Sequence, residues 1–472
     1  MRSKALIFVL AAVLAVSFAT PGASGPRPHP SKLKYEPLSV KTPETVEIAL
    51  SNGLSGFFVE DHEIPVVNVV ILVKTYFPDR GVYGLADMVR WVMRNGGTEA
   101  WPPDRLNDEL EFLAAIVETR GTDLNTQISV NCLKKDLPRV LGILADLVMN
   151  PAFPGDKIEM KRKTMLEDIR RKNDDPGPVS RREFAKLVYG DHPYGWEPSV
   201  ETVSAITREH LVAFHETYFH PNNAIIGVSG DVTREEIVGA LETAFALWRP
   251  ADVSIPAVPD VAAPAAPSVH YAYMDINQAY ITIGHEGINA KNPDRCAVTI
   301  MNFILGGGSF TSWIMEKVRS DEGLAYHAGS SYSSDAFAKG LFSASAQTKG
   351  EACSRATQIM IDLIRRMREE GPTSDEVKKA VDFYVNSQVF DYESKSQVMM
   401  RLVSLRFAGR PLDSPERDME TYAKLTAADV KAAAEKYLAS DKLTMLFVGN
   451  AELFDRPLSD FGAVSEIKLE KQ

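Results

Sequence analysis

Apolar residues follow two periods along this chain, one typical of helices and one typical of strands. Helical spacing joins four apolar positions and stops at Asn150-Pro151, which ends the predicted helix: Val140, Leu141, Leu144 and Val148. Alternation predicts a half-buried strand over residues 341–346 and a weaker one over residues 127–131. Because predicted strands often follow one another directly, the pattern favours an α+β fold with mainly antiparallel sheets over a doubly wound parallel sheet.

The pattern occurs twice along the chain, at a fixed offset of 219 positions. Thr207 and Thr426 predict the N-caps of two equivalent helices, which run to Tyr218 and Tyr437. A short apolar strand follows each helix, over residues 224–228 and 443–448. The same offset relates a second set of positions, in which Val140, Leu141, Leu144, Val148, Asp156 and Ile158 match Ile359, Met360, Leu363, Met367, Asp375 and Val377. The chain therefore contains two copies of one domain.

The boundary between the two copies is predicted from composition. Residues 249–268 read RPADVSIPAVPDVAAPAAPS, are dense in Pro and Ala, and lack hydrophobic periodicity. Such a segment is typical of a linker. We expect an N-terminal domain over residues 37–248 and a C-terminal domain over residues 269–467.

Composition and charge narrow the class of protein. The chain has 472 residues, of which 45% are hydrophobic and 24% charged, a balance typical of a globular protein with a substantial core. Lys and Arg number 52 against 63 Asp and Glu, which gives a formal net charge of −11. Nucleic acid and anionic membranes demand a basic surface, so neither is expected as a primary partner.

The N-terminus has the pattern of an export signal. Arg2 and Lys4 precede an apolar run over residues 5–16, and the small residues that follow fit cleavage after Ala19. A retained membrane anchor is the alternative, but the run is shorter than the roughly 20 residues that span a bilayer. We expect a signal peptide over residues 1–19, an extended lead-in over residues 20–36, export to a bacterial periplasm, and no stable membrane insertion.

Several longer segments resemble one known family. They are GLADMVRWVMRNGGT at 84–98, FPGDKIEMKRKTMLEDIRRKNDDP at 153–176 and LGGGSFTSWIMEKVRSDEGLAY at 305–326. In this order they resemble the pitrilysin/insulinase family of zinc peptidases, and the similarity spans nearly all of the chain. The resemblance implies two homologous domains, each a mainly antiparallel sheet packed against helices, which face each other as a clam-like pair.

The family's zinc motif is degenerate in this chain. Active members carry His-x-x-Glu-His on a helix, in which two His bind the metal, the Glu acts as general base, and a later Glu completes the ligands. The matching positions here are Asp87, Arg90 and Trp91, with Glu167 at the third ligand. An indole offers only an N–H donor, and a guanidinium stays protonated. We therefore expect no zinc in this chain and no hydrolysis by the chain alone.

The degenerate positions have other possible roles. Asp87 and Arg90 are three residues apart, so they are predicted to pair on one helix face. Trp91 would fill the volume that a metal site occupies. Alternatively, Asp87 and Glu167 retain a site for a different cation.

A second group of potential metal ligands lies in HETYFH, with His215, Glu216, His220 and the nearby His210. His215 and His220 are five residues apart, about 140° around a helix, so they point in different directions. We interpret them as polar residues at a helix end.

Glycine and cysteine are two further candidates for chemistry. The glycines at 306–308 lack the Gly-Lys-Ser/Thr of a phosphate loop, so they are expected to allow a tight turn at a helix end. Cys132, Cys296 and Cys353 are few, odd in number and far apart, and we expect them to be small buried side chains rather than ligands.

Arg319 and Tyr326 are the candidate substrate-binding residues. The resemblance assigns an Arg and a Tyr at the matching positions to the peptide backbone and to the oxyanion opposite the zinc. A guanidinium and a phenol O–H both donate to an oxygen that gains charge, which suits that role. From spacing alone, the alternative is an Arg at a helix end and a Tyr facing the core.

Loss of the zinc ligands with retention of the Arg/Tyr segment resembles the two-chain members of the family. We expect the zinc-less subunit of an exported heterodimeric metallopeptidase, whose partner is a homologous subunit that carries the zinc motif and whose substrate is a peptide. The alternative is a non-enzymatic scaffold or binding protein of the same fold. Hydrolysis by an unrecognised site in this chain is a third hypothesis.

Overall fold

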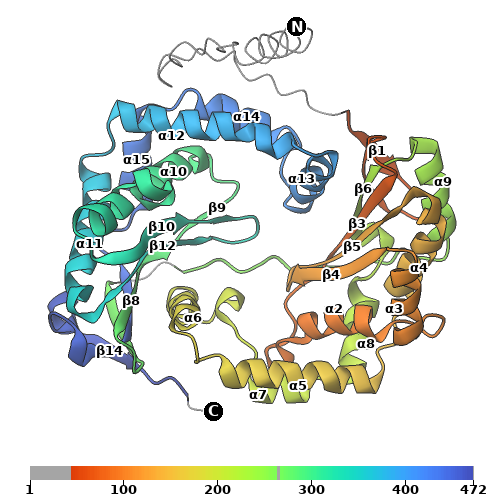
Figure 1. The fold of residues 1–472 in the computed structure, drawn as a ribbon, viewed down its shortest axis with the longest axis horizontal. Coiled ribbons are helices and arrows are strands. Elements are labelled where there is room, and N and C mark those ends of the chain that lie inside the picture. Colours follow the sequence, from red (N-terminus) through yellow and green to blue (C-terminus); the bar gives the residue numbers. More distant parts are fainter. Residues whose placement is uncertain (1–43, 263–265, 471–472) are drawn as a thin grey trace, which may run out of the picture. The chain divides into compact units, whose positions relative to one another are not determined.

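The computed structural model of the chain describes residues 44–262 and 266–470. The predicted signal peptide and its cleavage site, and the lead-in at 20–36, lie outside these residues. The described residues belong to one compact unit that contains two six-stranded sheets (Figure 1). We call residues 44–248 the first half and residues 266–470 the second half.

The first sheet is mixed but mainly antiparallel, and its strand order is β1-β2-β6-β3-β5-β4. Only β2 and β6 are parallel to each other among its neighbouring strands. The strands are β1 (Val46–Ala49), β2 (Ser55–Glu60), β3 (Val66–Lys74), β4 (Ile116–Thr122), β5 (Asn125–Leu133) and β6 (Ala224–Gly230).

Helices of the first half share one large hydrophobic core with this sheet. They are α2 (Leu85–Gly96), α3 (Pro103–Phe112), α4 (Leu137–Met149), α5 (Gly155–Arg171), α7 (Val200–Ala205), α8 (Arg208–Tyr218) and α9 (Arg234–Ala244). Helix α2 contacts the edge strand β4 and also packs against α5 and α8. The candidate zinc-motif helix is thereby fixed at one edge of the sheet.

The second sheet has the order β10-β12-β8-β13-β7-β14 and repeats the first except at one edge, where β14 is parallel to β7 while β1 is antiparallel to β2. Its strands are β7 (Ser268–Tyr273), β8 (Gln278–Glu286), β10 (Ala325–Tyr332), β12 (Leu341–Lys349), β13 (Thr444–Gly449) and β14 (Val464–Ile467). A short parallel pair, β9 (Ile288–Asn289) and β11 (Ser334–Asp335), lies outside it. Five helices of this half are α10 (Arg295–Asn302), α11 (Cys353–Glu369), α12 (Ser374–Ser387), α14 (Ser414–Tyr422) and α15 (Ala427–Tyr437).

The sequence offset of 219 relates equivalent elements of the two halves. Helices α8 and α15 begin and end at matching positions, and α5 and α12 begin at matching positions. Thr207 and Thr426 cap their helices with capping boxes, as predicted. The predicted α+β fold of two homologous, mainly antiparallel domains is confirmed.

Each half also covers the other half's sheet with one helix. Helix α6 (Pro176–Tyr189) comes from the first half and packs on β8 and β13 of the second sheet, whereas α13 (Lys395–Phe407) comes from the second half and packs on β2 and β6. These two helices also begin 219 positions apart. Gly227 makes room for α13, because a Cβ at this position would lie 2.0 Å from the sulfur of Met399.

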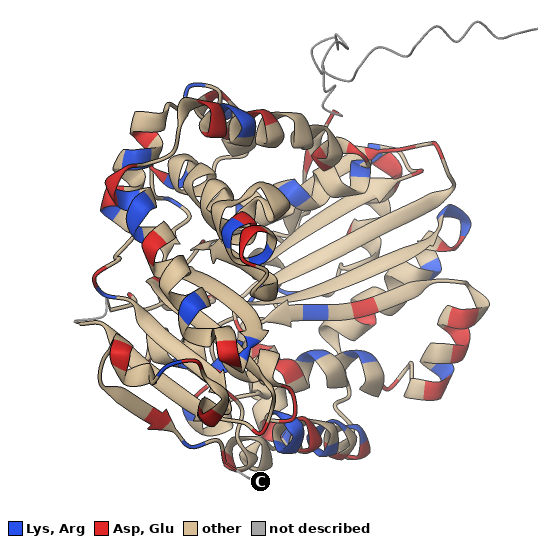
Figure 2. Ribbon diagram, turned by 60° about the vertical axis from the view of Figure 1, so that its left-hand side comes forward, with Lys and Arg blue, Asp and Glu red and all other residues tan. Residues whose placement is uncertain are grey.

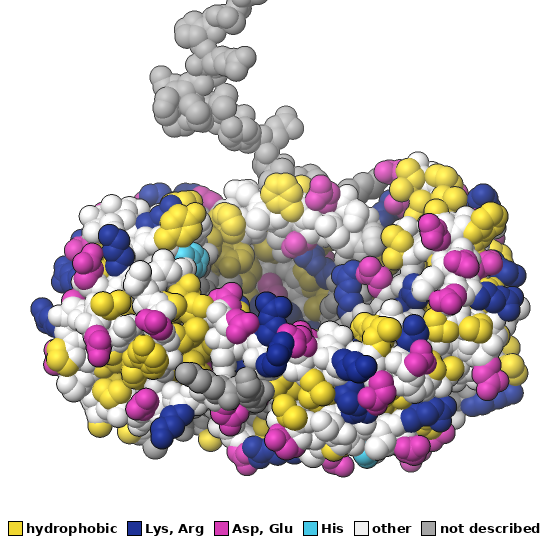
Figure 3. Space-filling model, turned by 60° about the horizontal axis from the view of Figure 1, so that its bottom comes forward, with side chains coloured by type: hydrophobic (Ala, Val, Ile, Leu, Met, Phe, Trp, Pro, Cys, Tyr) yellow, Lys and Arg dark blue, Asp and Glu magenta, His cyan; other side chains and the backbone are white. Residues whose placement is uncertain are grey.

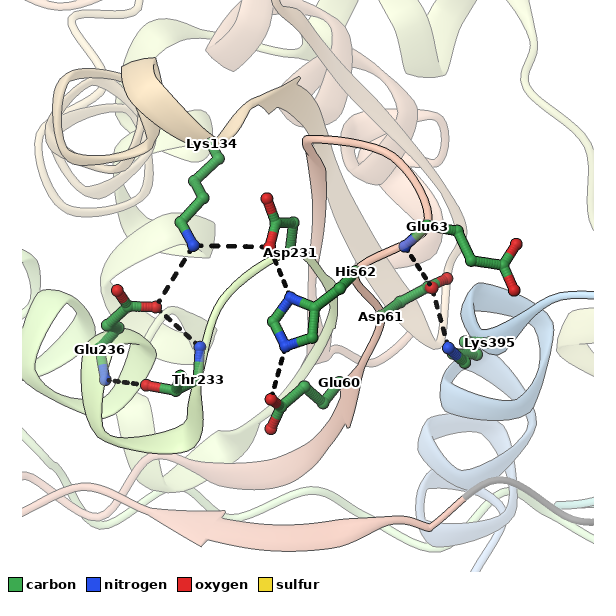
Figure 4. A network of polar contacts seen from close by, with 9 residues as sticks. All are labelled: Glu60, Asp61, His62, Glu63, Lys134, Asp231, Thr233, Glu236 and Lys395. Carbon is green, nitrogen blue, oxygen red and sulfur yellow. Dashed lines mark hydrogen bonds and ion pairs between the residues drawn. The ribbon is translucent and has the colours of Figure 1, made fainter.

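A polar network joins the start of α13 to the first sheet (Figure 4). The ammonium of Lys395 lies 2.9 Å from Asp61 in the loop between β2 and β3. The next residue, His62, places Nδ1 2.5 Å from Asp231 and Nε2 2.7 Å from Glu60. Because both partners are carboxylates, both ring nitrogens can donate only when the imidazole is protonated.

Charged residues lie mostly on the helices and loops, while the strands carry few of them (Figure 2). Among the described residues, no helix combines the length and the apolar character that a bilayer span requires.

Candidate functional site

Helix α2 presents the degenerate motif through its amphipathic pattern. Its apolar residues, including Met88, Val89 and Val92, are buried in the core of the first half. The side chain of Asp87 is half exposed, and Trp91 is partly buried against the same core. The helix begins after Gly84, whose φ of 103° lies in the left-handed region that favours glycine.

Arg90 is buried inside this helix–sheet edge. Only 9% of its side chain is exposed, and its Nη1 donates to the carbonyl oxygen of Thr122, 2.5 Å away. Its Nη2 lies 3.8 Å from Asp87, so the predicted pairing on the helix is confirmed. Burial lowers the pKa of Arg90, while the charges of Asp87 and Asp123 oppose that shift.

Lys161 of α5 also faces the degenerate motif, and the sequence reasoning missed it. Its Nζ lies 2.7 Å from Asp87, whereas the Nη2 of Arg90 lies 3.8 Å away. Only 12% of the Lys161 side chain is exposed. Glu167, the matched third ligand, pairs at 2.7 Å with Arg170 of its own helix. The two carboxylates that could have shared a cation therefore each face a basic side chain.

A partly buried carboxyl group, that of Asp123, lies near the motif. Tyr83 donates its hydroxyl to Asp123 at 2.7 Å. Burial raises the pKa of Asp123 and that of Tyr83. Sequence patterns gave no signal for this pair, because the two residues are 40 positions apart in loops.

These donors do not fit zinc. Zinc sites in proteins use imidazole, thiolate and carboxylate ligands in a close tetrahedral group. Here Arg90 and Lys161 place two positive charges beside Asp87, and Trp91 offers no lone pair. Over residues 44–262 and 266–470, no group of three or more His, Cys, Asp or Glu side chains could hold a metal ion.

The structure brings Arg319 and Tyr326 together. Arg319 lies in a π-helical turn (Met315–Asp321), and its guanidinium carbon is 5.4 Å from the centre of the Tyr326 ring. The Tyr326 side chain is 82% exposed, so it does not face the core. Its hydroxyl and the guanidinium of Arg319 make no hydrogen bond or ion pair with any described residue.

Phe310 is a neighbour of this pair that the sequence did not single out. Its ring centre lies 4.9 Å from the guanidinium carbon of Arg319, and 63% of the residue is exposed. Two exposed rings therefore flank one guanidinium, which pairs with no carboxylate of residues 44–262 and 266–470. Cation–π contacts of this kind orient the guanidinium and leave its N–H donors free.

The glycine run before Phe310 serves a different purpose from the one expected. None of the three glycines at 306–308 has a positive φ, and the left-handed residue of the turn is Ser309, with φ of 54°. Gly306 is required by space, because a Cβ there would lie 2.3 Å from the backbone nitrogen of Ser330 on β10. The run does follow a helix end, as predicted.

The remaining candidates have structural roles. His215 Nε2 lies 2.8 Å from the carbonyl of Val148, and burial lowers its pKa to about 4. His220 contacts the carbonyls of Glu216 and Arg249, so HETYFH forms no joint site. The cysteines are unpaired and buried, as predicted.

The surface carries charges of both signs. Figure 3 shows one face with a hollow at its middle, and basic, acidic and apolar side chains are interspersed around it. No single-sign field of the kind that binds nucleic acid is visible on this face.

Comparison with known solved structures establishes the fold. The chain is similar to the crystal structure of a peptidase M16 inactive domain from Pseudomonas fluorescens, with a TM-score of 0.79, 24% identity, and coverage of 90% of this chain and 100% of that one. It is also similar to a protease from Helicobacter pylori, with a TM-score of 0.76, 19% identity, and coverage of 86% and 99%.

Sequence relatives agree with these neighbours. An uncharacterized zinc protease of Streptomyces coelicolor is 27% identical over 65% of this chain and 68% of its own length. Another, from Rickettsia bellii, is 25% identical over 83% of this chain and 94% of its own length.

Two family models match successive segments of the chain, and the second match begins within the first half. The model described as Insulinase (Peptidase family M16) matches residues 65–196, and the model described as Peptidase M16 inactive domain matches residues 205–384. The chain belongs to the insulinase family, peptidase family M16.

Proposed function

We propose that this chain is the non-zinc subunit of an exported heterodimeric metallopeptidase of the insulinase family. The observation that carries the proposal is the contrast between two sites. At the motif helix, Arg90 and Lys161 place two positive charges beside Asp87. On the second half, Tyr326 is exposed, and the partly buried Arg319 makes no hydrogen bond or ion pair with any described residue.

In this proposal the zinc lies in a homologous partner subunit. Arg319 and Tyr326 bind the extended peptide and donate to its carbonyl oxygen as that oxygen gains negative charge. No described carboxylate pairs with Arg319, which supports this role, since an unpaired guanidinium keeps its donors free for a substrate.

The test combines the chain with a homologue that carries His-x-x-Glu-His. Peptide cleavage is measured for each chain alone and for the mixture, and only the mixture is expected to be fully active. Arg319→Ala and Tyr326→Phe are each expected to lower kcat of the mixture about 100-fold, the usual effect of losing one oxyanion donor.

Matched controls separate this role from a general surface effect. Arg365→Ala removes a half-exposed Arg from α11, and Tyr273→Phe removes an exposed hydroxyl from β7; neither should change kcat. Full activity of both the Arg319 and Tyr326 variants would overturn the proposal. Recovery of envelope proteins without a zinc-motif homologue, in a pull-down from the source cells, would favour the scaffold hypothesis instead.

The export part of the proposal has its own test. Expression of the full chain in a Gram-negative host, followed by fractionation and N-terminal sequencing, should give a periplasmic protein that begins at Thr20 or a few residues later. A cytoplasmic protein that begins near Met1 would contradict export. It would not contradict the proposal that the chain is a non-zinc subunit.

A further inference from the structure

A cavity of about 400 Å³ is lined by residues of both halves. Tyr83 and Asp123 reach it from the first half beside the degenerate motif, and Asp335 reaches it from β11 of the second half. Nothing in the proposed catalytic role uses this cavity. The described residues of its lining combine aromatic rings with two carboxylates and include no Lys or Arg.

The aromatic part of the wall is held by edge-to-face ring contacts. The ring centres of Tyr189 and Tyr194 are 5.5 Å apart, and those of Phe77 and Tyr194 are 5.9 Å apart. Tyr83 adds a fourth ring to the lining. Electron-rich ring faces attract ammonium and guanidinium groups, most strongly where water is partly excluded.

Each carboxylate in the wall is fixed by a tyrosine rather than by a cation. Tyr83 donates to Asp123 Oδ2 at 2.7 Å, and Tyr194 donates to Asp335 Oδ1 at 2.5 Å. Asp335 Oδ1 also accepts from the backbone N–H of Phe337. Neither carboxylate has a Lys or Arg within ion-pair distance among the described residues.

Arg90, which is not part of the lining, affects the pKa of one lining carboxyl group, that of Asp123. Arg90 donates to the carbonyl of Thr122, next to Asp123. Its charge opposes the effect of burial on Asp123 and helps that carboxyl group to stay ionised. The second oxygen of each aspartate, Oδ1 of Asp123 and Oδ2 of Asp335, takes part in no hydrogen bond with the described residues.

We propose that this cavity binds an organic cation, an ammonium or guanidinium group on an alkyl chain. The rings contact the alkyl chain and the cation, and Asp123 and Asp335 accept its N–H donors. Applied to the peptidase role, the cavity selects peptides with a Lys or Arg side chain. That assignment of a substrate class rests on the proposed function, whereas cation binding itself does not.

The test measures binding to the full chain without any partner. Calorimetry compares a short peptide that contains one arginine with the same peptide that contains citrulline, which has nearly the same shape but no charge. The arginine peptide should bind at least about tenfold more tightly, in line with the strength of charge-assisted hydrogen bonds. The second arm of the experiment uses free agmatine, a guanidinium on an alkyl chain. It distinguishes a site for a peptide side chain from a site for a small free cation.

The variants are chosen to remove charge and keep shape. Asp123→Asn and Asp335→Asn each preserve an oxygen that accepts from the neighbouring tyrosine, and each should weaken arginine-peptide binding about tenfold. Asp275→Asn, at an exposed loop position, should leave binding unchanged. Thermal melts of all variants confirm that they fold.

The outcomes divide cleanly. Equal binding of the arginine and citrulline peptides, or unchanged binding by both aspartate variants, would overturn the cation site. Binding of agmatine but of neither peptide would support the site and contradict the peptide assignment. If partner-dependent cleavage is observed while no cation binds, the cavity inference fails and the proposed function stands.

Discussion

The ammonium of Lys161 lies 2.7 Å from the carboxylate of Asp87, at the helix position where the family's active members carry a metal ligand. Together with the buried guanidinium of Arg90, it makes this edge of the first half cationic. A basic residue of α5 therefore faces the degenerate motif, and substitution of the motif residues alone would leave its charge in place.

Restoration of the motif should reveal the effect of Lys161. The triple variant Asp87→His, Arg90→Glu, Trp91→His, with Glu167 in place, is expected to bind zinc weakly. Addition of Lys161→Ala should tighten binding at least about tenfold, because it removes a like charge a few ångströms from the metal. Chelator competition gives the affinity. Lys163→Ala on the same helix is the control, and equal gains from both lysine variants would contradict the prediction.

Arg90 should matter for stability although it is charged. Arg90→Ala leaves the carbonyl of Thr122 without its donor and removes the cation that offsets Asp123. We expect a loss of about 2–3 kcal/mol in the free energy of unfolding, measured with urea. Arg171→Ala, which removes an exposed pair with Asp174, should cost less than about 0.5 kcal/mol. Similar losses in both variants would refute a special role for Arg90.

Phe310 should hold the guanidinium of Arg319 in place. In the protein with ¹⁵N-labelled arginine, the Arg319 Nε–H signal lies near two rings, so Phe310→Ala should shift it by removing one ring current. In the mixture with a zinc-bearing subunit, the same variant should lower kcat/KM by about tenfold or less, because Arg319 itself remains. Phe112→Ala removes another exposed ring, far from Arg319 in the sequence, and serves as the control. An unmoved signal would exclude this positioning role.

His62 should make stability depend on pH. Its hydrogen bond to Asp231, followed by that to Glu60, raises the pKa of the imidazole above the ordinary value of about 6.5. The stabilisation is therefore complete below about pH 6.5 and is lost as pH rises through the raised pKa. The other charged groups of this network are Asp61, Glu63, Lys134, Glu236 and Lys395 (Figure 4).

The measurement compares melting temperatures of the protein and its His62→Gln variant at pH 6 and pH 9. The difference should be larger at pH 6, and added salt should shrink it because the network is exposed. His327→Gln, at an exposed position on β10, should show no such pH-dependent difference. A larger difference at pH 9 would reverse the sign and refute the assignment.

Gly227 should tolerate no side chain. A Cβ there meets Met399 at 2.0 Å and Val403 at 2.8 Å, so Gly227→Ala should destabilise the protein by about 1–3 kcal/mol. Gly239→Ala lies in α9 with open space around it and should stabilise by about 0.5–1 kcal/mol. Urea unfolding gives the change in the free energy of unfolding for each variant. Changes of the same sign would show that α13 moves to accommodate the added methyl group.

Local patterns predicted the elements well because capping and periodicity depend on near neighbours. The helices after Thr207 and Thr426 begin and end where predicted, and the strand predicted at 341–346 is part of β12. The helix that ends before Asn150 was also predicted from its apolar spacing and its breaker. The repeat was visible because both copies keep the same spacing between these signals.

Contacts between distant segments could not be read in the same way. The pairing of Lys161 with Asp87 depends on how α5 crosses α2, and the bond from Tyr194 to Asp335 joins different halves. The glycines at 306–308 showed that the backbone is special there, but only the structure shows that β10 is what approaches Gly306. Phe310 became a candidate only through its distance to Arg319.

The reciprocal placement of α6 and α13 sets an order for biosynthesis. While the ribosome is still translating the second half, the face formed by Phe57, Val59 and Ile225 on the first sheet has no cover, since α13 ends only at Phe407. During that interval the nascent chain exposes an apolar β-surface, which is a hazard for aggregation. Neither half should be obtainable as a soluble fragment, and chaperone dependence should fall sharply once residue 407 has emerged.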